Sequence, residues 1–294
     1  MSQGPRLQTE RRLIGESEAA RTIREFRRRK VAVASFFIMV VLVTAVILAP
    51  VFAPDPIAQD LKNRLQKPSL AHPFGTDYLG RDLLGRVIHG GRISLSVGLI
   101  VVAIAVIFSV PIGLVAGYFG GRVDDLLMRL MDALLTFPPL LLAIALLASL
   151  GPDIKNAMLA LGLVRIPRFA RLVRGCVISA KENQYVEAAR SIGARDLRIM
   201  LFHIWPNVAA PLLVQSTISF AAAILAEAGL SFLGLGVQPP TPSWGRDISE
   251  GYKYLREAPW MAIFPMAAIM VSAISMNLVG DGLRDAMNPR LRGR

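Results

Sequence analysis

Residues 185–206 hold two acidic side chains and several small residues within a polar, basic segment that separates two strongly apolar ones. Tyr185 opens this segment, and Glu187 is followed by two alanines. The Glu187 carboxylate can accept hydrogen bonds from a basic side chain or from backbone amides of another molecule. Ala188 and Ala189 add little bulk, so the groove of a partner could approach closely. The chemistry indicated is recognition of another protein.

The local sequence predicts a helix, a turn and a second helix. Residues 185–192 are rich in helix formers and predict a short amphipathic helix. Gly193 permits a sharp reversal that a β-carbon would hinder. Asp196 falls in the first turn of the next helix, where its charge suits the positive end of the dipole. His203 and Pro206 mark the return to apolar sequence. We expect a solid projecting knob, with a plain helical hairpin at a membrane surface as the alternative.

The apolar segments around this knob predict a membrane protein. The 294 residues are 53% hydrophobic and only 18% charged, whereas soluble domains carry about 25% charged residues. A sixth segment, 156–177, begins apolar and then meets four arginines. Since a lipid-facing segment must satisfy its own backbone hydrogen bonds, we expect an all-α fold with six transmembrane helices. Five stretches without Asp, Glu, Lys or Arg can each supply the ~20 apolar residues that cross a bilayer: 31–54, 93–121, 133–152, 199–226 and 258–280.

Basic residues gather on one side of this predicted membrane topology. Residues 1–30 contain nine Lys and Arg, residues 165–203 contain eight, and the tail from Asp281 contains four. An excess of Lys and Arg marks the cytoplasmic side, which predicts cytoplasmic N and C termini. The expected organisation is an Arg-rich segment, a first transmembrane helix with its external loop, a core of five transmembrane helices that includes the cytoplasmic loop 180–206, and a tail: 1–30, 31–92, 93–284 and 285–294.

The net charge of +12 does not indicate a nucleic-acid-binding protein. The basic residues follow the membrane topology, and no clustered face of base-reading residues or stacking aromatics accompanies them. Anionic lipid headgroups are expected to attract the basic run 27–30. The first apolar segment is expected to remain as a span, because Ala-Pro-Asp-Pro follows it in place of a cleavage site. The single cysteine, Cys176, cannot form an intrachain disulfide.

Ionisable residues in or beside the predicted spans form a second candidate group. Asp132 lies near the start of the third span, Glu227 lies within the fifth, and Asp281 lies near the end of the sixth. Arg165 and Arg168 lie deep in the fourth. Such residues are costly inside a membrane and mark either a translocation path or paired helices. The sequence leaves both roles open.

The first external segment is dense in turn formers and charges, among them Asp77, Arg81 and Asp82. These residues could form a structural network of turns or face a partner. No phosphate-binding G-x-x-x-x-G-K-[ST] sequence is present, and neither is a G-x-S-x-G or H-E-x-x-H motif. The three histidines are scattered. We therefore expect no catalytic, metal or cofactor site in this chain.

Several motifs resemble those of one transporter family. The segment 185–206 resembles the "EAA" loop of ABC-importer permeases, which docks onto an ATPase subunit. The likeness extends over roughly residues 20–290, with Met287-Asn288 in place of the usual Leu-Asp. Within the family the chain is similar to the second of two permease subunits. Further matches are to the two external regions and the C-terminal signature of dipeptide/oligopeptide/nickel-type permeases: 72–77, 80–82, 91–95, 230–245 and 277–290.

The resemblance implies a type I ABC-importer permease in the bacterial inner membrane. Its implied partners are a homologous permease subunit, two ATPase subunits that bind ATP and magnesium, and an extracytoplasmic solute-binding protein. The implied solute is a dipeptide or oligopeptide, with nickel, glutathione or an opine as open alternatives. The implied ATPase-coupling loop comprises Tyr185, Glu187, Ala188, Ala189, Gly193, His203 and Pro206. The external motif or translocation path would include Asp77, Arg81, Asp82, Asp132 and Glu227.

Two other classes of function are weighed against this one. An ion-gradient-driven secondary transporter often shows inverted repeats and broken helices at the membrane midplane, and no clear repeat is found in this sequence. A scaffold or assembly factor that transports nothing is the third possibility. Such a factor would show no solute-dependent stimulation of a partner ATPase.

Overall fold

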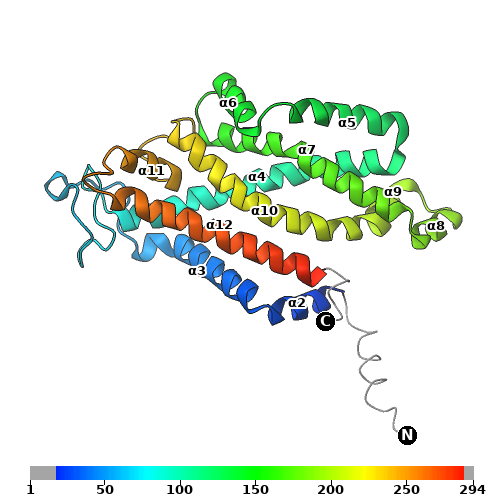
Figure 1. Ribbon diagram of the computed structural model, residues 1–294, viewed down its shortest axis with the longest axis horizontal. Helices are drawn as coiled ribbons and strands as arrows, with labels where there is room; N and C mark the ends of the chain where they lie inside the picture. Colours follow the sequence, from blue (N-terminus) through cyan, green and yellow to red (C-terminus); the bar gives the residue numbers. More distant parts are fainter. Residues whose placement is uncertain (1–17, 288–294) are drawn as a thin grey trace, which may run out of the picture.

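The computed structural model describes residues 18–287, which form an elongated bundle of helices (Figure 1). Parts of the predicted segments 1–30 and 285–294, including Asn288 of the C-terminal motif, lie outside the described residues. Within 18–287 no strand is found, and the one β-bridge joins Thr76 to Asp82. The long helices lie side by side along the bundle: α3 (Lys30–Phe52), α4 (Leu83–Phe119), α7 (Ile154–Lys181), α10 (Trp205–Phe232) and α12 (Trp260–Met287).

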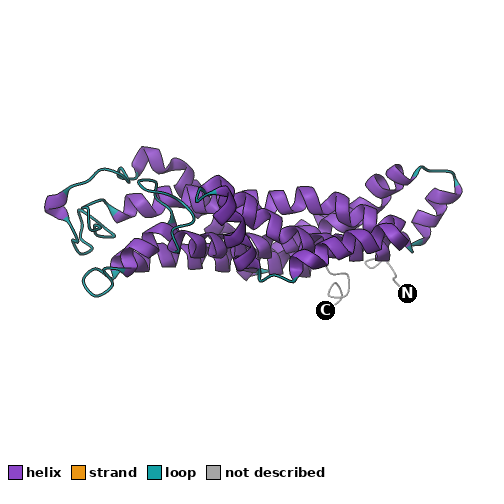
Figure 2. Ribbon diagram, turned by 90° about the horizontal axis from the view of Figure 1, so that it is seen from above, coloured by secondary structure: helices purple, strands orange, loops and turns teal. Residues whose placement is uncertain are grey.

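Short elements mark the two ends of the bundle. Helix α11 (Trp244–Tyr252) and the loops between α3 and α4 lie at one end, called the α11 end. Helix α8 (Gln184–Ser191) projects at the other, the α8 end, toward which α2 (Glu18–Arg28) and the end of α12 also lie (Figures 1 and 2). A 3₁₀ turn, Leu61–Asn63, lies in the first of the α11-end loops. Helix α11 was not predicted from the sequence.

Four helical stretches are long and apolar enough to cross a membrane: Lys30–Phe52, Leu83–Phe119, Asp196–Phe232 and Trp260–Met287. They correspond to the first, second, fifth and sixth predicted spans. The second begins ten residues before its apolar stretch because Asp82 caps it, accepting a hydrogen bond from Gly85 N at 3.0 Å. Helix α7 contains the predicted fourth span and packs along α4. Its four arginines make it less apolar than the four stretches above, and it is not among them.

The predicted third span is two helices. Helix α5 (Gly121–Leu135) and helix α6 (Pro139–Leu150) meet at an angle of 86°. The sequence analysis predicted one transmembrane helix over 133–152, and the structure divides this stretch between α5 and α6. Pro139 has no N–H to donate and disfavours helical backbone at Pro138, whose ψ is 130°. Helix α5 begins at Gly121, twelve residues before the predicted stretch.

Small residues bring α4 and α7 into close contact. Gly113 and Gly117 lie one helical turn apart on α4, a G-x-x-x-G spacing that allows helix backbones in membranes to approach. A β-carbon at Gly113 would lie 2.6 Å from Val173 Cβ, and one at Gly117 would lie 2.7 Å from Val177 Cβ. The two valines belong to the buried cluster that also supports α8. The interface therefore requires glycine at both α4 positions.

We expect Gly113→Val to lower the free energy of unfolding by ~1–3 kcal/mol, because the added methyl groups would push α7 away from α4. Gly175→Ala is the control, since a β-carbon at this α7 position meets nothing within 4 Å, and it should be neutral or stabilising by up to ~1 kcal/mol. Thermal unfolding of the purified protein in detergent measures both. Equal melting temperatures for the two variants would contradict this account of the interface.

Candidate functional site

A buried network of charges occupies the α11 end. Asp77 accepts hydrogen bonds from Leu79 N at 2.8 Å and from Arg81 N at 2.9 Å through Oδ1. Its Oδ2 accepts from Arg81 Nε at 2.5 Å. Arg81 Nη2 in turn donates to Glu250 Oε2 at 2.9 Å, and Arg246 Nε donates to Glu250 Oε1 at 3.1 Å. The first external loop is thereby fastened to α11, across 169 residues of sequence.

A second ion pair lies beside the first. Arg86 is 1% exposed and donates through Nε to Asp247 Oδ1 at 3.0 Å, and through Nη1 to Pro56 O at 3.2 Å. Asp247 Oδ2 is buried and has no hydrogen-bond partner among the described residues. Burial raises the pKa of Asp247 to about 6, against the opposing effect of the Arg86 cation. The ionised form of Asp247 therefore depends on the Arg86 cation.

The third predicted residue of the external motif has a different position. Asp82 caps α4 through Oδ1, and its Oδ2 lies 2.8 Å from His72 Nδ1. Two tryptophans complete the attachment of the loops to the helices. Trp244 Nε1 donates to Val87 O at 2.7 Å, and Trp260 Nε1 donates to Thr76 O at 3.2 Å. All three motif residues are buried. Their side chains contact one another's loops and α11 through hydrogen bonds and ion pairs.

Glu227 lies at the junction of α4, α10 and α11. It is fully buried, and its carboxylate accepts from Ser231 Oγ at 2.6 Å and from Ser94 Oγ at 3.4 Å. Each serine is itself an acceptor, Ser231 from Val237 N and Ser94 from Trp244 N. Since a hydroxyl has one proton to donate, both serines direct it to Glu227. The contacts of Glu227 are thus those of a packing junction.

The other predicted ionisable residues lie apart from Glu227. Asp132 is exposed and pairs with Arg171 of α7. One turn further along α7, Arg174 Nε donates to Asp124 Oδ1 at 2.5 Å. Asp281 is exposed on α12. Asp124 and Asp132 therefore hold α5 against α7. The structure does not bring Asp132, Glu227 and the external motif together into one site.

The predicted helix, turn and helix are present at the α8 end. Gly193 has a φ of +79°, in the left-handed region that glycine adopts without a steric cost. Gly193 N donates to Arg190 O at 3.0 Å, and Ala194 N donates to Ala189 O at 3.1 Å. These two bonds form a Schellman motif, which satisfies the last carbonyls of α8. The reversal is therefore fixed by backbone hydrogen bonds.

The predicted loop residues divide into exposed and buried groups. Glu187, Ala188, Gly193 and Pro206 are exposed, and His203 is half-buried. Ala189 is 5% exposed and packs into the bundle, so the prediction that both alanines face a partner groove was wrong for Ala189. Tyr185 is partly exposed, and its hydroxyl accepts from Asn207 Nδ2 at 3.0 Å. The outer surface instead includes large apolar side chains that the sequence analysis did not name: Ile192, Leu197, Leu201 and Phe202.

Polar contacts join the knob to the ends of the long helices. After Gly193 the chain forms a short helix, Asp196–Arg198, and then a π-helix, Ile199–Ile204, before α10 begins. Tyr118 Oη, near the end of α4, donates to Asp196 Oδ1 at 2.6 Å. Lys181 Nζ, at the end of α7, donates to Gly117 O at 3.0 Å. Movement of the knob is therefore tied to α4, α7 and α10.

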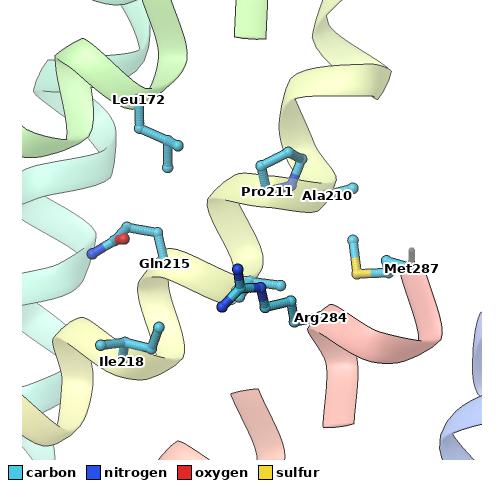
Figure 3. Close-up of a pocket in the computed structure, with 8 residues that line it drawn as sticks. Leu172, Ala210, Pro211, Gln215, Ile218, Arg284 and Met287 are labelled. Carbon is cyan, nitrogen blue, oxygen red and sulfur yellow. The ribbon is translucent and has the colours of Figure 1, made fainter. Parts of the chain in front are cut away.

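A hollow of about 490 Å³ lies between the helices near the α8 end. Leu172 approaches it from α7, Pro211 and Gln215 from α10, and Arg284 and Met287 from α12 (Figure 3). Among the described residues, no group of three or more His, Cys, Asp and Glu side chains could hold a metal ion. The hollow is therefore a space between three long helices, lined by apolar side chains together with Gln215 and Arg284.

The long apolar helices of this bundle are those of a membrane protein. The profile of the family described as "Binding-protein-dependent transport system inner membrane component" matches residues 109–293, and that of the "N-terminal TM domain of oligopeptide transport permease C" matches residues 17–68. The chain belongs to the first of these families, and it is a multi-pass inner-membrane protein.

Several curated relatives are similar over almost their full length. The dipeptide transport system permease protein DppC of Alkalihalophilus pseudofirmus is 43% identical over 270 residues, 92% of this chain and 89% of the relative. The di/tripeptide transport system permease protein DppC of Pseudomonas aeruginosa is 44% identical over 274 residues, 91% and 90%. The glutathione transport system permease protein GsiD of Escherichia coli is 43% identical over 272 residues, 92% and 90%. These comparisons give the secondary-transporter alternative no support.

We expect Arg86→Leu to lower the free energy of unfolding by ~3–5 kcal/mol, because it leaves the Asp247 carboxylate buried without its cation. The double variant Arg86→Leu/Asp247→Leu should recover most of this loss, since no buried charge remains. Arg246→Leu removes a partly exposed partner of Glu250 and should cost less than ~1 kcal/mol. Thermal unfolding of the purified variants measures all three. A double variant as unstable as Arg86→Leu would contradict the pairing argument.

Proposed function

We propose that this chain is one of two homologous permease subunits of an ATP-driven importer of dipeptides or oligopeptides. Six spans, with both termini in the cytoplasm, would place the knob on the cytoplasmic side and α11 outside. Two ATPase subunits would bind ATP and magnesium and dock on the knob, and a solute-binding protein would deliver the peptide at the α11 end. The chain itself would carry no cofactor.

The geometry of the knob is the observation that carries this proposal. Helix α8 projects beyond the bundle and presents the exposed Glu187 and Ala188, and Ile192, directly after the helix, is 86% exposed. Further along the knob, the exposed Leu197, Leu201 and Phe202 line one hollow, and a contiguous exposed apolar patch is typical of a surface that another protein covers. The Schellman turn and the Tyr118–Asp196 bond make the surface rigid. A rigid protrusion can transmit a push from a motor to the helices that hold it.

The choice of solute is supported by the relatives. Those named above are permeases for dipeptides, di- and tripeptides, and glutathione. We infer that ATP draws the two ATPase subunits together, that the knob passes this movement to α4, α7 and α10, and that the subunits rock to open the outer side. Hydrolysis would then restore the inward-open state. Coupling of this kind requires an energetic link between the two ends of the permease.

We expect Glu187→Lys to leave membrane insertion intact and to abolish ATP-dependent peptide uptake, because it reverses the charge that the knob offers to the ATPase. Glu182→Lys is the matched control, since this exposed residue lies at the end of α7 and before the knob helix. Uptake by membrane vesicles and co-purification of the ATPase subunits measure the effect. Normal uptake and normal co-purification by Glu187→Lys would refute the docking role.

We expect Gly193→Val to lose ATPase co-purification and uptake, because valine in left-handed backbone costs at least ~1–2 kcal/mol and would open the turn. No atom lies within 4 Å of the position of the missing β-carbon, so the cost is conformational. Gly193→Asn is the matched control, because asparagine tolerates this backbone region, and it should retain most of the uptake. Equal activities for the two variants would show that the turn conformation does not matter.

A further inference from the structure

Four arginines lie along α7, and only two of them have acidic partners. Arg171 and Arg174, nearer the α8 end, pair with Asp132 and Asp124 of α5. Arg165 and Arg168 form no ion pair with any residue between 18 and 287. Moreover, Arg165 Nε is buried and has no hydrogen-bond partner in that range. Along α7, the two arginines nearer the α8 end therefore have acidic partners, and the two further from it have none among the described residues.

The unmatched arginines line a cavity of about 450 Å³. It lies between the α5–α6 bend, α7 and α10, and Ser219 contributes a hydroxyl to its wall. Ser219 Oγ accepts a hydrogen bond from Gln215 Nε2 at 3.1 Å, and Gln215 lines the hollow of Figure 3. That second hollow contains Arg284, which also forms no ion pair within the described chain. Polar groups and cations therefore follow one face of α10 from the α8 end into the bundle.

The depth of Arg165 makes its lack of a partner costly. It lies eleven residues from the start of α7 at Ile154, or ~16 Å at the rise of an α-helix. In the proposed six-span arrangement α7 crosses a hydrocarbon core ~30 Å thick, and Arg165 would lie near the middle of the membrane. Charged residues at that depth mark pathways or bind one another. The phosphate of a lipid headgroup lies near the membrane surface and cannot reach Arg165 without deforming the bilayer.

We propose that Arg165 and Arg168 bind the carboxylate of the transported solute as it passes through the permease. The inference rests on the proposed function, and it identifies the chemical group of the peptide that this subunit recognises. Every peptide with a free C-terminus carries a carboxylate, as does glutathione, the solute named for one relative. Guanidinium groups bind carboxylates by charge-assisted hydrogen bonds. A solute that binds transiently explains why no resident acid occupies the cavity.

The test uses the complete transporter in proteoliposomes, with both permease subunits, the ATPases and the binding protein. A dipeptide and its C-terminal amide are first titrated against the isolated binding protein, so that uptake is compared at saturation. We expect Arg165→Gln/Arg168→Gln to reduce uptake of the free acid about 10-fold or more, the loss of a hydrogen bond to a charged group, and to leave uptake of the amide unchanged. Arg171→Gln, outside the cavity, should affect both peptides equally.

Two results would overturn this proposal. Uptake of acid and amide could fall together in the double variant, which would indicate a structural role or an acidic partner in the other permease subunit. Alternatively, neither could change. Wild-type complex that assembles and hydrolyses ATP but imports neither peptide would instead contradict the proposed solute, so the two failures are distinguishable.

A labelling experiment tests the anion site without relying on transport. Val164 lines the cavity next to Arg165, and Val164→Cys is made in a Cys176→Ala background. An anionic and a cationic methanethiosulfonate are applied to the purified complex, and each rate is divided by its rate with a free thiol. We expect a preference of about 10-fold for the anionic reagent, lost in Arg165→Gln/Arg168→Gln. Equal normalised rates before these substitutions would overturn the proposal.

Discussion

The pairing of arginine with carboxylate determines how the helices of this permease are held together. Charges are strongly penalised when they leave water, and the penalty is offset only by a well-placed partner. At the α11 end, Arg86 and Arg81 meet Asp247 and Glu250 of α11. On the opposite half of the bundle, Arg174 meets Asp124 of α5. Each pair joins segments far apart in the sequence, so the pairs fix which helices are neighbours.

Two glycines allow close packing between two of these neighbouring helices, α4 and α7. Gly113 and Gly117 of α4 lie directly against α7 over the half of the bundle that carries the knob. In a membrane no hydrophobic force draws helices together, so close packing of this kind supplies much of the attraction. Asp196 of the knob accepts a hydrogen bond from Tyr118 of α4, and Lys181 at the end of α7, just before the knob, donates to Gly117 O of α4. A stiff connection between the knob and the long helices is what a lever would need.

Local sequence was sufficient for some features. Charge-free stretches located four of the long helices, and Gly193 with the helix formers before it located the knob. Arg86, Asp247 and Glu250 were missed because their pairing spans more than 160 residues, which no local pattern reports. The sequence analysis placed one transmembrane helix at 133–152, and the structure divides it by an 86° bend at two consecutive prolines, Pro138 and Pro139. Ala189 was misassigned because helix periodicity alone did not reveal which of two adjacent alanines faces the bundle.

The contrast along α7 connects these observations. Where α7 meets α5, acids match its arginines; where α5 ends and bends into α6, the matching acids end as well. The bend at Pro138 thus leaves Arg165 and Arg168 facing a cavity in place of a helix. A static bundle would gain stability from an apolar residue in place of the partly buried Arg165, whose buried Nε has no partner among the described residues. The cost of Arg165 is consistent with a cavity that a charged solute enters and leaves, between helices that a motor at the α8 end can move.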